Sequence, residues 1–249
     1  MKTYNFVLVF GDVHGVWDVI PNFIRDNDLT NCAVFVAGDF GVGFEPMVKE
    51  LKRLKYLSKR LKHTNSCLYA VRGNHDNPAY FTGEFDSNNV KLVPDYTVLN
   101  VNGMNVLCVG GATSVDRTNR KSFYYPKDKN KNSNVMPIND YWKDEGFVYD
   151  HDKVMSMHDV DVVITHSAPS SALPYTKGSL DHWATYDKNL LQDSRIERAQ
   201  LFQLYDNLTN NGNVLKKWYY GHFHDSYFMK HFDTDFIGLN INEAVEMKL

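Results

Sequence analysis

The chain has 249 residues, of which 43% are hydrophobic and 14% aromatic, so a disordered chain is excluded and a full globular core is expected. Its 27 Lys and Arg residues against 30 Asp and Glu residues give a formal net charge of -3, which excludes a global basic field for nucleic acid but not a local basic patch. The three cysteines are odd in number, lack CxxC spacing and sit in or beside apolar runs. They predict buried free thiols in a reducing compartment.

The first predicted strand is the apolar run at 6–10. It is continuous, as expected for a strand that is covered on both faces. Because it is too short for a signal peptide or a membrane span, we expect a cytoplasmic protein without a membrane partner. The run ends at the cluster GDVHG over 11–15, and a helix is predicted at about 16–25.

Two further apolar runs, at 33–37 and 67–71, end in the same way at Gly38-Asp39 and at Gly73-Asn74-His75-Asp76. Between them, apolar residues at helical spacing predict an amphipathic helix over 47–61. The many Lys and Arg residues of this helix favour a solvated face over a nucleic-acid-binding patch. Strand, polar loop and helix in repetition predict an α/β sheet with its active groups beyond the carboxyl ends of the strands.

The middle of the chain changes character. Two strand-like runs over 96–109 flank Asn102-Gly103, which predicts an antiparallel hairpin. The segment at about 118–150 is rich in Lys, Asn, Tyr and Asp and is predicted to be an exposed polar insertion. Since no repeat or linker is visible, we expect a single domain over 1–249.

The last third returns to the earlier layout. A predicted strand at 160–164 leads into Thr165-His166-Ser167, and another at 217–220 leads into Gly221-His222-Phe223-His224. Between them, Ser194-Arg195-Ile196-Glu197 has the pattern of a capping box that opens a helix through about Leu208.

Apart from Asp76, the polar clusters supply two carboxylates, one carboxamide and five imidazoles. Such a mixed set favours Mn, Fe, Zn, Co or Ni over calcium or a structural zinc. Residues two apart on an extended chain share a face, so Asp12 with His14, and His222 with His224, are each predicted to clamp a metal ion. Asp39, with two carboxylate oxygens, is predicted to bridge two ions.

Two ions about 4 Å apart can hold a phosphoryl group and activate a hydroxide for attack on it. His75 is then free to act as general acid on the leaving oxygen, and Asp76 is placed to fix its tautomer. Arg72 offers a forked contact to phosphate oxygens.

The ordered set DxH, GD, GNH[DE], H and GHxH over 11–224 resembles the calcineurin-like metallophosphoesterase superfamily. The resemblance implies a four-layered α/β/β/α sandwich of two mixed β-sheets flanked by helices, and two metal ions, with manganese the first expectation. It implies that His75 is the general acid or transition-state histidine. The residues implied to hold the metals are Asp12, His14, Asp39 and His224 for one ion and Asn74, His166 and His222, with Asp39 shared, for the other.

The chain departs from one branch of that superfamily. Protein Ser/Thr phosphatases carry GDxVDRG, whereas residues 38–43 read GDFGVG, so the phosphate-binding arginine is missing and protein phosphatase activity is not expected. The stretch over 110–117, followed by Arg120, is similar to small bacterial and phage-type members. Arg117 and Arg120 are therefore candidates to replace the lost phosphate contact, and Asn74 is a further candidate substrate contact.

The expected function is hydrolysis of a phosphomonoester or phosphodiester, with nucleic acid a partner only as a substrate. One alternative is a nuclease-type phosphodiesterase, which would need a basic groove to bind the phosphate backbone of its substrate. Another is a catalytically inactive scaffold, which usually loses ligands. Neither the substrate nor the oligomeric state follows from these residues. Four aromatic residues are candidates to line a substrate cleft, with partial burial the competing interpretation: Tyr124, Tyr125, Trp142 and Trp183.

Overall fold

The computed structural model describes residues 3–122, 141–172 and 180–248, which form two β-sheets and six α-helices. The first sheet contains β1 (Phe6–Phe10), β2 (Cys32–Ala37), β3 (Cys67–Val71), β4 (Val90–Leu92) and β11 (Ala244–Glu246). The second contains β5 (Thr97–Val101), β6 (Met104–Val109), β7 (Val162–Thr165), β8 (Lys217–Tyr220), β9 (Tyr227–His231) and β10 (Thr234–Gly238). The helices are α1 (Val19–Asp26), α2 (Met47–His63), α3 (Arg117–Ser122), α4 (His151–Met155), α5 (Leu180–Ala184) and α6 (Leu190–Asn210), with a 3-10 turn at Pro78–Tyr80.

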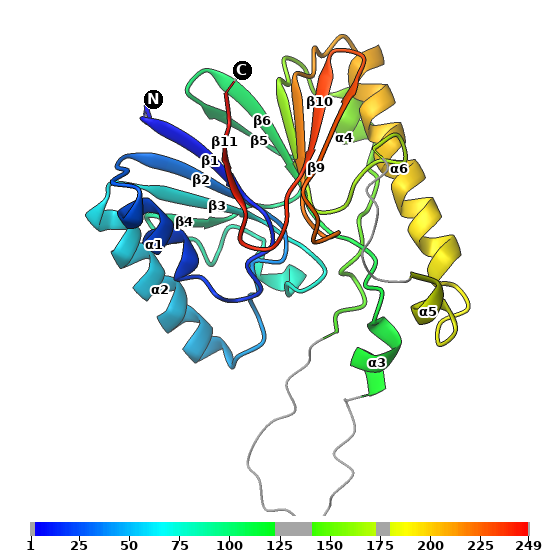
Figure 1. Cartoon of the computed structure of the whole chain (residues 1–249), viewed down its shortest axis with the longest axis horizontal. Helices are drawn as coiled ribbons and strands as arrows, with labels where there is room; N and C mark the ends of the chain where they lie inside the picture. Colours follow the sequence, from blue (N-terminus) through cyan, green and yellow to red (C-terminus); the bar gives the residue numbers. More distant parts are fainter. Residues whose placement is uncertain (1–2, 123–140, 173–179, 249) are drawn as a thin grey trace, which may run out of the picture.

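The two sheets pack face to face, with α1 and α2 on the outer face of the first sheet and α6 on the outer side of the second (Figure 1). The strand orders are β11-β1-β2-β3-β4 and β5-β6-β7-β8-β10-β9. Both sheets are mixed, because β11 runs antiparallel to β1, and β5 and β9 run antiparallel to their neighbours. The predicted four-layered sandwich is confirmed.

The continuous apolar strands follow from this layering. In β1, Val7 and Val9 point into the core between the two sheets, whereas Leu8 and Phe10 point into the core beneath α1 and α2. A strand that is covered on both faces needs apolar residues at every position. The third core, between the second sheet and α6, is built around the buried ring of Trp218.

The predicted hairpin is also present. β5 and β6 pair antiparallel, with Val101 opposite Met104. The two turn residues, Asn102 and Gly103, have φ angles of 52° and 82°. Both lie in the left-handed region that the two-residue hairpin turn requires, which explains why Asn-Gly stands there.

Two helix starts differ from the sequence prediction. α1 begins at Val19 rather than at about residue 16, and α6 begins at Leu190, before the predicted capping box. The predicted capping box is not formed, because Ser194 lies inside the helix and the Glu197 side chain does not bond to a backbone N–H at the helix start. Its buried carboxylate instead accepts a hydrogen bond from the Thr113 hydroxyl at 2.8 Å.

The predicted exposure of the polar insertion does not hold at its C-terminal end. Residues 123–140, including the Lys/Asn-rich centre and Tyr124 and Tyr125, lie outside the described residues. In the described part, Trp142, Glu145 and Phe147 are buried. The segment is held against the first sheet because the backbone carbonyls of Glu145 and Gly146 accept hydrogen bonds from Arg72.

Helix α2 is amphipathic, as predicted, but its buried face is narrower. Leu54, Leu57 and Leu61 are buried, whereas Met47 and Leu51 are exposed. The three cysteines are free and buried, in line with the prediction from their spacing. None of the described helices is long and apolar enough to cross a membrane.

Candidate metal centre

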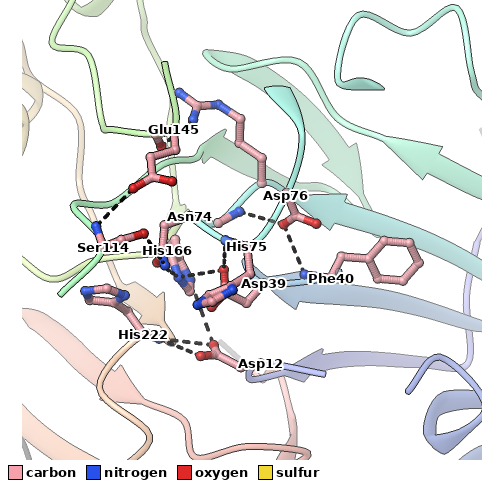
Figure 2. Close-up of polar contacts among 12 residues, drawn as sticks. Asp12, Asp39, Phe40, Asn74, His75, Asp76, Ser114, Glu145, His166 and His222 are labelled. Atoms are coloured by element: carbon pink, nitrogen blue, oxygen red, sulfur yellow. Dashed lines mark hydrogen bonds and ion pairs between the residues drawn. The ribbon is translucent and has the colours of Figure 1, made fainter. Parts of the chain in front are cut away.

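The polar clusters of the sequence meet at the carboxyl ends of the strands, where the two sheets face each other (Figure 2). Asp12 and Asp39 follow β1 and β2 of the first sheet, and Asn74 follows β3. His166 and His222 follow β7 and β8 of the second sheet. Both sheets therefore contribute side chains to one site.

A first group of four donors consists of Asp12, His14, Asp39 and His224. One ligand atom from each lies within 4.8 Å of the others. The His224 Nε2 atom is 2.9 Å from Asp12 Oδ2 and 3.1 Å from His14 Nε2. The two carboxylates are buried while the two imidazoles are partly exposed, so the group is open on one side. Two carboxylates and two imidazoles suit a divalent transition metal.

A second group forms around His166. Its Nε2 atom is 3.0 Å from Asn74 Oδ1 and 3.2 Å from Asp39 Oδ1, and its ring centre is 4.9 Å from that of His222. Its Nδ1 atom lies 2.9 Å from the Ala37 carbonyl oxygen, which can only accept a hydrogen bond. Nδ1 therefore carries a hydrogen, and Nε2 faces the two oxygens. Metal binding requires the neutral imidazole, and once the second proton has left, the Nε2 lone pair and the two oxygens converge as donors for one cation.

The charges of this centre are strongly coupled. Burial alone would lower the pKa of His166, but the carboxylates of Asp39 and Asp12 raise it to about 10. Burial alone would raise the pKa of Asp39, but the facing imidazoles, led by His166, hold it well below its usual range. Burial, reinforced by His166, keeps the pKa of His222 well below its usual value. Asp39 is thus ionised and His222 neutral, the forms in which both residues bind metals.

The two predicted clamps do not work through an extended backbone. His14, His222 and His224 have φ angles of 43°, 66° and 51°, in the left-handed region. Their side chains converge because the chain turns sharply after each strand, so the face-sharing argument is wrong for these pairs. The loop at β8 is tied to the loop at β1, since the His222 N–H donates to the Asp12 carboxylate at 3.0 Å.

Close packing explains two glycines of the clusters. Gly38 has a φ angle of 91°, and a Cβ there would collide with the imidazole of His166. A Cβ at Gly221 would collide with Oδ1 of Asp12. Larger residues at these positions would push a donor side chain out of the site.

Asp76 has a different role from the predicted one. Its fully buried carboxylate accepts hydrogen bonds from four backbone N–H groups rather than facing the His75 imidazole. These come from Phe40 at 3.0 Å, Gly41 at 2.7 Å, Val42 at 3.0 Å and Gly73 at 2.7 Å. Asp76 therefore joins the loops after β2 and β3. Burial, reinforced by the charge of Asp39, raises its pKa to about 6.

Arg72 and Arg117 are directed away from the site, which corrects two predicted phosphate contacts. Arg72 pairs with Asp95 at 2.8 Å and donates to the backbone carbonyls of Glu145 and Gly146 at 2.8 and 3.1 Å. These contacts use its whole guanidinium fork. Arg117 donates hydrogen bonds to Asp187 at 2.5 Å and to Asp193 at 2.6 Å. These ion pairs connect α3 to the start of α6.

Arg120 is buried beside the metal centre, in a network that the sequence did not reveal (Figure 2 shows its Ser114 and Glu145 members). Its Nη1 atom donates to Ser114 Oγ at 2.5 Å and lies 3.4 Å from Glu145 Oε2. The same Ser114 Oγ accepts from Asn74 Nδ2 at 3.0 Å. These contacts orient the Asn74 carboxamide, whose NH₂ group donates to Ser114 and whose oxygen faces His166. A serine in a loop carries no pattern that would have identified it.

A cavity of about 360 Å³ opens at the centre. Its lining contains His75, the candidate aromatic residue Trp183 and four of the seven donor residues, namely Asp39, Asn74, His222 and His224. Trp142 instead packs edge-on against Phe44. Residues of the wall that the sequence did not single out include Val115, Asp116, Arg198 and Phe223.

The fold and the site define an α/β sandwich with a candidate Asp/His metal centre at its strand ends. The chain belongs to the calcineurin-like phosphoesterase family, whose sequence model matches residues 7–226. The resemblance that the ordered clusters indicated is thereby confirmed. A comparison with curated proteins finds no match.

Several solved structures are similar. The phosphopantetheinyl hydrolase from Mycobacterium tuberculosis is 13% identical, with 97% of this chain and 92% of that chain covered and a TM-score of 0.43. A candidate 5'-nucleotidase from Staphylococcus aureus is 14% identical, with coverage of 95% and 48% and a TM-score of 0.48. The inner membrane complex anchor GAP50 of Plasmodium is 18% identical, with coverage of 95% and 71% and a TM-score of 0.40. At these identities the likenesses say nothing about the substrate of this chain.

Proposed function

We propose that the chain is a dinuclear-metal-dependent phosphoesterase that hydrolyses a phosphomonoester or a phosphodiester. The observation that carries the proposal is the position of Asp39, whose Oδ1 lies 3.2 Å from His166 Nε2 and whose Oδ2 lies 3.8 Å from His14 Nδ1. One carboxylate thus faces both donor groups. Family membership supports the reaction class.

The seven donors divide into two sets that share Asp39. Two divalent ions bound there, for which we propose manganese, would supply a water of lowered pKa and positive charge for the phosphoryl oxygens. The protein holds the donors in place through neighbouring backbone groups, such as the Ala37 carbonyl at His166. The first set is Asp12, His14, Asp39 and His224, and the second is Asp39, Asn74, His166 and His222.

His75 is the proposed general acid. Its backbone N–H donates to Asp39 Oδ1 at 2.7 Å, and the residue lines the cavity. The ring is not one of the seven donors and lies edge-on to His14, with 5.2 Å between the ring centres. Burial lowers the pKa of His75, while the Asp39 carboxylate opposes that effect. In its protonated form the ring would donate a proton to the leaving oxygen.

The cavity suits a substrate with a compact organic group. Trp183 and Phe223 supply aromatic surface at the wall. Arg198 is the one arginine of the described residues that lines the cavity, and it lies 5.7 Å from the ring of Phe223. We propose that Arg198, instead of Arg72, Arg117 or Arg120, supplies positive charge next to the substrate.

The test is hydrolysis of 4-nitrophenyl phosphate and bis(4-nitrophenyl) phosphate by protein loaded with Mn²⁺, with metal content measured on the same sample. The expected result is turnover of at least one ester and two metal ions per chain. Asp12→Ala, which removes a donor, should lose turnover together with metal. Protein that binds two metal ions and hydrolyses neither ester would overturn the proposal.

A further inference from the structure

Helix α2 presents an exposed basic face. It carries seven Lys and Arg residues and one acidic residue, the buried Glu50. Lys49 pairs with Glu45, Arg53 with Glu50, and Arg60 with Asp18. The other four basic residues are exposed and form no ion pair within the described part of the chain: Lys52, Lys55, Lys59 and Lys62.

Two hollows flank this basic face. The first, of about 570 Å³, extends from the loop 15–18 to Lys52 and Tyr56. The second, of about 710 Å³, extends from the same two residues to Lys62 and the loop 85–89. All four lysines without an ion pair, together with Tyr56, line the second hollow, which we name the α2 groove.

The first hollow lies next to the loop that carries the donor His14, because Gly15 lines it. Arg53 holds this loop against α2, since its Nη2 atom donates to the Gly15 carbonyl at 2.8 Å and its guanidinium carbon lies 4.0 Å from the centre of the Trp17 ring. The α2 groove lies between α2 and the loop 85–89. Figure 1 shows α2 on the outer face of the first sheet.

The sequence pattern alone favours a solvated face for this helix, but the four lysines also line a hollow. We propose that the α2 groove binds a single-stranded nucleic acid. Lys52, Lys55, Lys59 and Lys62 recur every three or four residues and so follow one side of the helix over about 15 Å. A row of unpaired ammonium groups attracts a phosphate backbone. Tyr56, in the middle of the row, is 58% exposed and offers a ring on which a base can stack.

Other polyanions fit less well. An acidic peptide would use the lysines but not the exposed ring of Tyr56. An anionic membrane would need apolar side chains free to insert along the lysine row, but the exposed ones of α2, Met47, Val48 and Leu51, lie at its N-terminal end. Within the row, Leu54, Leu57 and Leu61 are packed against the first sheet. The basic row together with an exposed ring is the combination that single-strand binders use.

The test measures binding alone, by fluorescence anisotropy of a labelled 20-nucleotide oligothymidylate with hydrolysis-resistant phosphorothioate linkages. Replacing Lys55, Lys59 and Lys62 by Gln keeps a helix-forming side chain and removes three charges. The dissociation constant should rise at least about tenfold at low salt, and the slope of log K against log salt should fall by about 2. Tyr56→Ala should weaken binding on the order of tenfold through lost stacking.

The matched control carries the same three changes on lysines away from the groove, at Lys143, Lys153 and Lys230, and should bind as the unaltered protein does. Equal losses in the control and groove variants would overturn the inference. So would binding to phosphatidylserine vesicles or polyglutamate in preference to the oligonucleotide. Because the assay reads no hydrolysis, a protein that fails to cleave aryl phosphates but loses oligonucleotide binding only in the groove variants would refute the proposed function and keep this inference.

Discussion

The Nε2 atom of His166 lies 3.2 Å from Oδ1 of Asp39, although the two residues follow strands of different sheets. The candidate metal centre is therefore a junction between the two sheets. Since metal binding to donors that only the folded chain assembles contributes to folding free energy, metal should stabilise the packing of one sheet on the other.

Replacing Asp39 by Asn should weaken both metal sites at once, because its carboxylate faces both donor groups. We expect the metal content to fall from two ions per chain to below one at micromolar Mn²⁺, and the stabilising effect of Mn²⁺ on the melting temperature to disappear. Metal analysis after gel filtration and thermal unfolding measure the two effects. Asp235→Asn, which alters a carboxylate paired with Lys217 away from the site, serves as the control. Loss of only one ion would show that Asp39 does not bridge.

Replacing His75 by Asn should lower kcat by about 10²–10⁴-fold, the usual contribution of a general acid. The metal content should stay at two ions per chain, because the His75 ring is outside the seven donors and its backbone N–H to Asp39 is retained. Steady-state kinetics and metal analysis on the same preparation test both points. If the variant loses metal, the assignment of His75 as an acid is wrong.

Replacing Ser114 by Ala should free the Asn74 carboxamide to rotate, since Ser114 Oγ holds both Asn74 Nδ2 and Arg120 Nη1. Loss of such a supporting contact typically lowers metal affinity by about 10–100-fold. Titration calorimetry with Mn²⁺ should show this loss at one of the two sites. Ser58→Ala removes another buried serine that accepts a hydrogen bond far from the site. If both variants lose a similar amount of unfolding free energy and neither changes its affinity for Mn²⁺, then Ser114 has only a structural role.

We expect the buried carboxyl group of Glu145 to lower the unfolding free energy of the protein as the pH rises. Burial, with a smaller contribution from Asp116, raises its pKa to about 7 against the attraction of Arg120. The unfolded chain should ionise near the ordinary value of about 4.3. Between these pH values the folded state holds more protons, so this residue's contribution to the unfolding free energy decreases with pH.

Glu145→Gln should remove that decrease, so its unfolding free energy relative to the unaltered protein should rise by on the order of 2 kcal/mol from pH 4 to pH 8. Urea unfolding in chelator across this range measures the difference. Glu246→Gln, an exposed change near the C-terminus, is the control. Parallel pH profiles for Glu145→Gln and the unaltered protein would contradict the raised pKa.

The regular parts of the fold were predictable because each depends on a short window of residues. The apolar run of β1 alternates between two cores, and Asn102-Gly103 fits the hairpin turn by its backbone preference. The capping box at Ser194 failed for the opposite reason, since Glu197 bonds to Thr113, a residue distant in sequence. A distant partner overrides a local pattern because the hydrogen bond goes to whichever donor the fold places nearest.

The sequence by itself determined which side chains form the candidate metal centre, because donor types and their positions after strands are local properties. Only the tertiary structure decided what the neighbouring polar residues do. Arg72 and Asp76 stand next to the donors in sequence, yet Arg72 pairs with Asp95 and Asp76 accepts backbone N–H groups. Conversely, Ser114 orients Asn74 from a loop 40 residues away. A buried charge or amide must be satisfied by the groups around it in space, and sequence neighbours do not reveal which groups those are.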